Sequence, residues 1–335
     1  MSELRQNPIT GQWVVYALSR TGRPYDFRSP VTAEASLPES DTNCPFCPGN
    51  EHMLPPIIME TKNRNGRCWQ TRVVPNRFPA LQPEDSPALS RKGPYRITGG
   101  YGYHEVIIES PVHNRDIYSM PVSGVEAVVD TYHRRYVDLS KDERVKAIFI
   151  FRNHGKDAGT SLRHPHSQLI AAPVTPGSIK LREQRADDYY TANSSCMICD
   201  ILRSEERLQE RILKENASFL AFIPYTAEVP FEIYLFPKFH GPDFGLITDR
   251  EKGDLSTMLQ TVTRLLYRKL SDPDYNLYIT SFTHCDKDSP FLHWYIVLQP
   301  RMTIKAGFEI GSGMAINPSL PEEDCKFLKD CAKEM

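Results

Sequence analysis

The sequence lacks the long apolar runs, the charge bias and the dense cysteine content that mark several classes of protein. No apolar stretch approaches the roughly 20 residues that a membrane-spanning helix needs, and no signal-peptide core follows Met1, so a cytoplasmic protein is expected. A formal charge of −2 leaves no basic excess for nucleic acid and no polybasic tract for a membrane surface. Local charges and backbone dipoles must therefore meet any anionic ligand.

Glycine-rich loops between a strand and a helix are also missing, so Rossmann and P-loop nucleotide sites have no support. Eight cysteines in 335 residues are too few for a disulfide scaffold. Four of them form two Cys-x-x-Cys pairs, which in a cytosolic protein indicate metal or redox sites. The others are expected to be packing or surface thiols: Cys68, Cys285, Cys325 and Cys331.

The order of strand-like and helical runs predicts a mixed α+β fold with mostly antiparallel sheet. Runs rich in β-branched and aromatic residues predict strands at 12–17, 72–74, 103–109, 145–152, 167–172, 231–236, 275–282 and 293–298. Helical spacing of apolar residues marks 123–137 and 249–270. The polar segment 173–195 is interpreted as a helical or loose connection between two halves. We therefore expect an N-terminal domain over 1–185 and a C-terminal domain over 186–335.

Two cysteines and two histidines recur in the same order in each half. The two sets are Cys44, Cys47, His113, His164 and Cys196, Cys199, His240, His293. The third member of each set follows a strand-like run and a proline, so internal duplication is the simplest explanation. Two thiolates and two imidazoles suit tetrahedral, structural zinc, and two zinc ions per chain are predicted. Two alternatives stay open: reduced core thiols beside unrelated histidines, and a redox pair, although neither pair lies in a clear βαβ unit.

The two halves differ two residues after the last member of each set, where the first half has His166 and the second has Tyr295. Positions i and i+2 of a strand share a face, so His166 is expected beside His164 but free to react. A neutral imidazole is a competent nucleophile near neutral pH. The alternative is that His166 is a third metal-cluster histidine or a buried hydrogen-bonded residue.

Polar residues that could bind phosphate lie close to His166 in the sequence. Backbone N–H groups and side chains upstream can meet phosphate oxygens, and the candidates are Asn153, Gly159, Thr160 and Ser161. Gln168 shares the strand face of His166, so its amide can also donate to a phosphate. The remaining histidines are expected to be surface or hydrogen-bonded residues rather than ligands: His52, His104, His133, His154 and His284.

The run His164-Pro165-His166-Ser167-Gln168, with Cys44-Pro45-Phe46-Cys47 upstream, resembles the active-site sequence of the galactose-1-phosphate uridylyltransferase family. The resemblance extends from about Arg5 to about Leu320 and implies two halves of the histidine-triad superfamily fold in a homodimer. It also implies a ping-pong reaction. His166 would attack the α-phosphorus of UDP-glucose, expel glucose-1-phosphate and pass the uridylyl group to galactose-1-phosphate.

The same resemblance assigns substrate contacts. It implies that Gln168 and Ser161 hold phosphate oxygens, and that other contacts come from Arg20 and Arg23 (phosphate), Asn76, Arg77 and Phe78 (base and ribose), and Lys305, Phe308 and Glu309 (sugar). In the family, the segment around Glu309 reaches the site of the other subunit. The expected partners are thus a sugar nucleotide, a sugar-1-phosphate and a second copy of the chain, with no nucleic acid and no membrane.

Two departures from the family pattern keep the substrate open. After His293 the sequence lacks two further histidines that hold iron in many members, so the second set resembles a two-zinc branch that includes ADP-glucose phosphorylase-like enzymes. Ser167 also replaces a common glycine. An ADP-sugar phosphorylase is therefore a second hypothesis, and a non-catalytic zinc-stabilised nucleotide-binding protein is a third. Intact His166 argues against the third, and Glu309 with Lys305 favours a sugar-phosphate acceptor.

Overall fold

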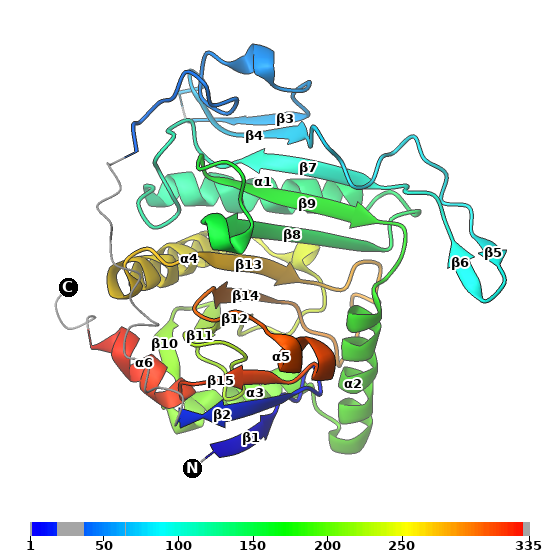
Figure 1. Cartoon of the computed structure of the whole chain (residues 1–335), viewed down its shortest axis with the longest axis vertical. Helices are drawn as coiled ribbons and strands as arrows, with labels where there is room; N and C mark the ends of the chain where they lie inside the picture. The colour runs from blue at the N-terminus through cyan, green and yellow to red at the C-terminus, as the bar shows by residue number, and fades with distance from the viewer. Residues whose placement is uncertain (1, 19–36, 64, 331–335) are drawn as a thin grey trace.

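A computed structural model describes residues 2–18, 37–63 and 65–330. Its centre is a ten-stranded sheet in the order β10-β11-β12-β14-β13-β8-β9-β7-β4-β3, and every neighbouring pair is antiparallel (Figure 1). The strands are β3 (Met59–Lys62), β4 (Trp69–Pro75), β7 (Tyr103–Ile108), β8 (Ala147–His154), β9 (His166–Ala172), β10 (Ile212–Glu215), β11 (Phe219–Phe222), β12 (Ile233–Pro237), β13 (Tyr275–Thr280) and β14 (Tyr295–Pro300).

Smaller elements surround this sheet. A three-stranded sheet joins the two ends of the chain, with β15 (Ala315–Asn317) parallel to β2 (Trp13–Ala17) and β1 (Ser2–Gln6) antiparallel to it. A separate hairpin pairs β5 (Ser90–Lys92) with β6 (Tyr95–Ile97). The helices are α1 (Val122–Leu139), α2 (Gly177–Asn193), α3 (Met197–Leu208), α4 (Asp249–Leu270), α5 (Gly307–Ser312) and α6 (Pro321–Lys329), with short 3-10 turns η2 (Glu51–Met53), η3 (Lys156–Ala158) and η4 (Phe244–Leu246).

The two halves of the large sheet have the same strand order. From the outer edge to the centre, the first half runs β3, β4, β7, β9, β8 and the second runs β10, β11, β12, β14, β13. A long helix separates the third strand of each half from its central strand, α1 in the first half and α4 in the second. The central strands β8 and β13 pair with Asn153 opposite Asn276, so one continuous sheet spans both halves. The predicted α+β fold with duplicated antiparallel halves is confirmed.

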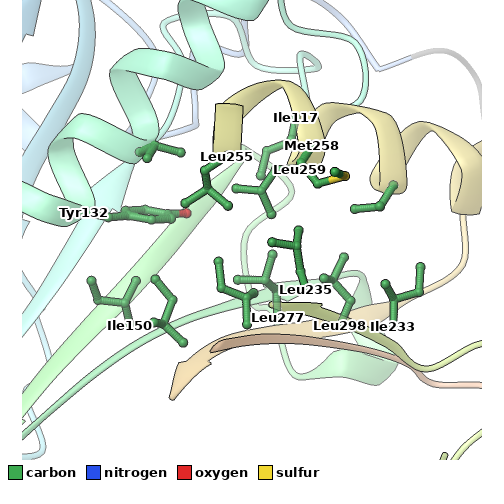
Figure 2. Packing of buried hydrophobic residues seen from close by; sticks show 14 of the residues in the cluster. Ile117, Tyr132, Ile150, Ile233, Leu235, Leu255, Met258, Leu259, Leu277 and Leu298 are labelled. Carbon is green, nitrogen blue, oxygen red and sulfur yellow. The ribbon is translucent and has the colours of Figure 1, made fainter. Parts of the chain in front are cut away.

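One face of the large sheet packs against α1 and α4, and this contact forms the main core (Figure 2). The sheet contributes Ile150, Ile233, Leu235, Leu277 and Leu298, and helix α4 contributes Leu255, Met258 and Leu259. Leu169 on β9 points into this core. Because side chains alternate along a strand, His166 and Gln168 point to the opposite face.

That opposite face is covered differently in the two halves. In the second half, a cluster of buried aromatic and aliphatic side chains from β11, β12 and β14 packs against α3 and Ile9. In the first half, Val106 and Ile108 of β7 pack beside the Cys44–Cys47 turn. On this face the first half therefore carries a smaller apolar cluster beside His166 and Gln168, where the second half carries a larger hydrophobic core.

Most long elements lie where the sequence pattern predicts them. Helix α4 matches its predicted range because Thr248 and Glu251 form a capping box at its start. The connection around 173–195 is helical, as one of the two options stated, and forms α2. Short elements such as β3, β10, β11 and α3 were not predicted. Among the described residues, none of the helices is long and apolar enough to cross a membrane.

Candidate active site and metal clusters

The first set of cysteines and histidines comes together in one buried cluster. Cys44, Cys47, His113 and His164 are all buried, and their ligand atoms lie within 4.8 Å of one another. The Cys47 Sγ lies 3.4 Å from the His113 Nδ1, and both sulfurs lie 3.6 Å from the His164 Nδ1. The His164 Nε2 lies 2.7 Å from the Ser110 carbonyl oxygen. An N–H on Nε2 can thus donate to this oxygen, which leaves the Nδ1 lone pair facing the sulfurs.

These distances fit a tetrahedral metal ion. Zinc bonds of ~2.3 Å to sulfur and ~2.0 Å to nitrogen place the two ligand atoms about 3.5 Å apart. Burial lowers the pKa of His164 to about 4, so its imidazole is neutral near pH 7 and available as a ligand. The cluster could therefore hold a metal ion at the point where the Cys44–Cys47 turn meets the residues before β9.

The second set is assembled less completely. The ligand atoms of Cys196, Cys199 and His240 lie within 4.8 Å of one another, and Cys199 is partly exposed. The His293 ring lies beside His240 with 5.5 Å between ring centroids, much as His164 lies beside His113 in the first cluster at 5.2 Å.

The ring of His293 also has an unused nitrogen. Its Nε2 is buried and has no hydrogen-bond partner, while its Nδ1 lies 2.9 Å from the Trp294 carbonyl oxygen. An orphaned buried nitrogen is unfavourable unless a ligand satisfies it. The ligand atoms of Cys196, Cys199 and His240 could hold a second metal ion, and this unpaired nitrogen is a candidate fourth donor.

His166 is the first residue of β9 and is 9% exposed. Its Nδ1 lies 2.8 Å from the carbonyl oxygen of His164, so the Nδ1–H donates to that oxygen. The Nε2 lone pair is then free. Burial lowers the pKa of His166, which favours the neutral imidazole near pH 7. The cluster residue His164 thus fixes the tautomer of its neighbour through its backbone.

Phe46 links the cysteine turn to both histidines. Its ring lies edge-on at 5.8 Å from His164 and 5.4 Å from His166, measured between ring centroids. Edge-to-face contacts at this distance are favourable. The aromatic residue inside the Cys-x-x-Cys turn therefore packs directly against the candidate nucleophile.

A buried ionic network lies beneath β9 on the opposite face of the sheet. Arg152 is 2% exposed and donates to Glu109 at 2.9 Å and to Asp116. Glu109 also accepts from Tyr132 and Ser167. The Glu109 backbone N–H donates to the carbonyl oxygen of Pro165 at 3.1 Å. This network holds the chain on both sides of His166, and no sequence motif indicated it.

His154, left unassigned from the sequence, extends this network. Its two ring nitrogens lie 3.1 Å from Asp116 and 2.9 Å from Asp272. Burial opposes a charge on this ring, but the Asp116 carboxylate outweighs it and raises the pKa of His154 to about 9. His154 therefore carries a proton near neutral pH as part of an ionic cluster.

The connection between β8 and β9 carries the expected phosphate-binding residues Gly159, Thr160 and Ser161 in the stretch that precedes the His164–His166 run. Its shape depends on Gly155, where φ is +83° and a Cβ atom would lie 1.8 Å from the Asp274 carboxylate. The backbone N–H groups of Gly159 and Thr160 donate to carbonyl oxygens within the loop, at 3.0 and 3.3 Å. Asn153 accepts from Asn276 at 2.9 Å, which leaves its own amide N–H groups as donors.

Gln168 takes part in a hydrogen-bonded group with Asn76 and His104. The His104 Nε2 lies 2.7 Å from the Gln168 Oε1, and the Asn76 Nδ2 lies 3.4 Å from the same oxygen. His104 thus reaches the site, although the sequence left it unassigned. The sequence indicates that His104 shares a strand face with Val106. Its contact with Gln168 follows from the pairing of β7 with β9, in which Val106 lies opposite Gln168.

Other expected substrate contacts are more exposed. Phe78 is 83% exposed, and the Arg77 guanidinium lies 5.9 Å from its ring centroid. The Lys305 Nζ lies 3.5 Å from Glu228, and Glu309 accepts from the Ala306 N–H at the start of α5. These polar contacts of the 305–309 segment are all with residues of the second half.

Arg20 and Arg23, the two arginines expected to bind phosphate, lie outside the described residues.

The pattern of the galactose-1-phosphate uridyl transferase N-terminal domain matches residues 1–176, and that of the C-terminal domain matches residues 182–297. An ADP-glucose phosphorylase from Arabidopsis thaliana is 31% identical over 98% of this chain and 92% of its own length. A galactose-1-phosphate uridylyltransferase from Thermotoga maritima is 30% identical over the full length of both proteins.

Solved structures agree with these matches. The crystal structure of an ADP-glucose phosphorylase from Arabidopsis thaliana with bound ADP-glucose has a TM-score of 0.84 to this chain at 30% identity, over 98% of each chain. A uridylyltransferase structure at 24% identity shares the fold with a TM-score of 0.76. The chain belongs to the galactose-1-phosphate uridyl transferase family.

Proposed function

We propose that this protein is a sugar-nucleotide nucleotidyltransferase that works through a covalent nucleotidyl-His166 intermediate. The observation that carries the proposal is the hydrogen bond from the His166 Nδ1 to the His164 carbonyl, which leaves the Nε2 free in a buried neutral ring. A neutral nitrogen nucleophile held in one orientation meets the requirement for covalent catalysis at phosphorus.

The reaction has two balanced halves. In the first, the Nε2 lone pair of His166 forms a bond to the α-phosphorus, and the bond from that phosphorus to the bridging oxygen breaks, which releases the sugar-1-phosphate. In the second, a phosphate oxygen of the acceptor attacks the same phosphorus, and the N–P bond breaks. The imidazole leaves unchanged. Side-chain donors of Gln168, Asn153 and Ser161 are available for the phosphate oxygens.

We propose zinc as the metal of both clusters, with a structural role. Closed sets of two cysteines and two histidines leave no open position for substrate. Metal analysis should find close to two zinc per chain and little iron. A single zinc per chain would remove the second cluster from the proposal.

Galactose-1-phosphate uridylyltransferase activity is our first choice of specificity: the donor is UDP-glucose and the acceptor is galactose-1-phosphate. Relatives with this name support it, as do Lys305 and Glu309, which suit a sugar-phosphate acceptor. The second candidate is an ADP-glucose phosphorylase that passes an adenylyl group to phosphate. It is favoured by the 31% identity to a protein of that name and by the second cysteine-histidine cluster.

Separate incubations with UDP-glucose and ADP-glucose distinguish the two candidates. The protein is expected to release glucose-1-phosphate from UDP-glucose in a burst and to form UDP-galactose when galactose-1-phosphate is added. Turnover only with ADP-glucose and inorganic phosphate would favour the second candidate. A wild-type protein that releases glucose-1-phosphate from neither donor would refute nucleotidyl transfer itself.

We further propose a homodimer in which the 305–309 segment completes the site of the partner copy. Ile304, Phe308 and Ile310 are exposed at 91%, 50% and 75%, which is unfavourable for apolar side chains unless another surface covers them. Mixing His166→Asn and Glu309→Ala subunits should restore part of the activity, because one of the two sites in a mixed dimer is intact. No recovery in mixed dimers that have been shown to form would contradict this arrangement.

A further inference from the structure

We propose that His104 is a positioning residue that fixes the amide of Gln168, so that the Gln168 NH2 group faces the reacting phosphate. This inference rests on the proposed function and extends it to a residue that does not itself touch substrate. It follows from which groups around Gln168 can donate and which can accept.

The backbone decides the tautomer of His104. The Ala80 N–H donates to the His104 Nδ1 at 3.1 Å, so this nitrogen must be the acceptor. A neutral imidazole has one acceptor and one donor nitrogen, and the proton therefore lies on the Nε2. The Nε2–H points at the Gln168 Oε1 at 2.7 Å.

Asn76 supplies a second donor to the same oxygen. Its Oδ1 accepts from the Phe78 N–H at 2.9 Å, which turns its Nδ2 toward His104 and Gln168. The Asn76 Nδ2 lies 3.1 Å from the His104 Nε2, but both nitrogens carry hydrogens, so this contact is not a hydrogen bond. The Gln168 Oε1, 3.4 Å away, is left as the acceptor.

The orientation of Gln168 follows from these two donors. Its oxygen has two acceptor sites and meets one donor at each. Reversing the amide would place the NH2 group against two N–H groups and leave all of them without acceptors. The NH2 group of Gln168 therefore points away from His104 and Asn76, on the same strand face as His166.

The second half provides an internal comparison. The position that corresponds to Gln168 is Val297, which pairs with Tyr234 as Gln168 pairs with Val106. Two positions before Tyr234, where the first half has His104 two positions before Val106, the second half has Glu232. This residue directly precedes β12 and accepts from Gln299 at 2.7 Å. The nucleophile, the amide and the histidine behind the amide are thus all replaced in the half that has no open site.

The test measures single-turnover formation of the nucleotidyl-enzyme from UDP-glucose and from ADP-glucose. His104→Ala should slow this step by about 10- to 100-fold at saturating donor, because a freely rotating amide is a poorer transition-state donor. The KM for the donor should change by less than about threefold, since the amide acts mainly on the developing charge. His104→Gln keeps an N–H near the place of the Nε2 and should recover most of the rate.

Two comparisons separate positioning from a structural role. In a Gln168→Ala background, His104→Ala should have no further effect, because there is no amide left to orient. A full additional loss in that background would overturn the inference. His133→Gln is the matched control, since His133 lies on α1 across the sheet and bonds the Gly245 carbonyl, and it should keep its rate within about twofold.

The tautomer can be read from the wild-type protein. Long-range 1H–15N spectra should show His104 as a neutral ring protonated on Nε2, and a ring protonated on Nδ1 would overturn the inference even if the variants fail to fold. If the wild type forms no adduct with either donor, the proposed function fails. If it forms one and His104→Ala matches the wild-type rate, only the role of His104 fails.

Discussion

The two halves of this chain share strand order, helix placement and a set of cysteines and histidines, yet only the first half has a histidine two residues after the set, the proposed nucleophile His166. In the second half, the same face is filled by side chains of β11, β12 and β14 under α3. Tyr295, at the position of His166, is 2% exposed there. The shared strands and the shared cysteine-histidine sets therefore do not distinguish the halves; the residue at the position of His166 and the apolar cover of the second half do.

The two cysteine-histidine sets also differ in the hydrogen bonds that their last histidines, His164 and His293, make with the residues that follow them. His164 directs its Nδ1 at the cysteines and its carbonyl at the His166 ring. His293 instead directs its Nδ1 at the Trp294 carbonyl and leaves its Nε2 unpaired. The first set is therefore linked through the His164 carbonyl to the ring of His166, the proposed nucleophile, whereas the second set joins the start of α3 to the residues before β14.

The largest expected difference between the halves comes from removing one metal ligand in each. Cys44→Ser should lower the nucleotidyl-transfer rate of the folded protein by about 100-fold or more, because a displacement of about 1 Å near a reacting group has this effect. Cys199→Ser should lower thermal stability but keep the rate within about threefold. Rates are normalised to the folded fraction measured by circular dichroism. Equal rate losses in the two variants would show that both clusters serve the site.

Buried arginines give a second paired test. Arg152 bridges Glu109 and Asp116 in the first half, and Arg211 bonds Glu205 in the second. Arg152→Met and Arg211→Met should each reduce the free energy of unfolding by about 3–5 kcal/mol, because each leaves a carboxylate buried without its partner. Urea titration measures this loss.

Only the first of these substitutions should also slow nucleotidyl transfer, because Glu109 holds Ser167 and the Pro165 carbonyl on either side of His166. Arg144→Met is the control, since the Arg144 side chain is 56% exposed in its pair with Asp142, and its free energy of unfolding should change much less than that of Arg152→Met or Arg211→Met. An unchanged transfer rate in Arg152→Met would remove the network from the site.

A histidine at position 295 tests whether the nucleophile alone distinguishes the halves. Tyr295→His should form no second adduct, because the position is covered, and it should reduce the free energy of unfolding by about 1–3 kcal/mol. Mass spectrometry should still find one nucleotidyl group per chain. Two groups per chain would mean that the second face opens to substrate.

The smallest effect concerns pH. Burial raises the pKa of the Glu232 carboxyl from its ordinary value of 4.5 to about 8. The folded state then binds more protons than the unfolded state between these values, so stability should fall as pH rises through this window. Glu232→Gln removes the titrating group and should flatten that part of the profile.

Thermal unfolding at pH 5 and pH 8 measures the difference. The loss of stability from pH 5 to pH 8 should be smaller in Glu232→Gln than in the wild type, while Glu84→Gln, at an exposed carboxylate, should follow the wild type. The same slope in the wild type and in Glu232→Gln would refute a raised pKa at Glu232.

The sequence predicted the fold class, the long elements and the chemistry of the ligand sets, because periodicity and residue type carry that information. It could not show that Glu109 and Arg152 pair beneath His166, since residues on separate strands meet only through sheet register. His104 was missed for the same reason: its contact with Gln168 depends on the pairing of β7 with β9. The covering of the second half by α3 is a tertiary feature without a local pattern.

The most direct measurement maps the covalent adduct. The wild-type protein, incubated with UDP-glucose or ADP-glucose and digested at neutral to alkaline pH, should yield one peptide heavier by a nucleotidyl group, with the group on His166. His166→Asn should yield no such peptide. An adduct on another residue of the wild type, or an adduct that persists in His166→Asn, would contradict the assignment of His166 as the nucleophile.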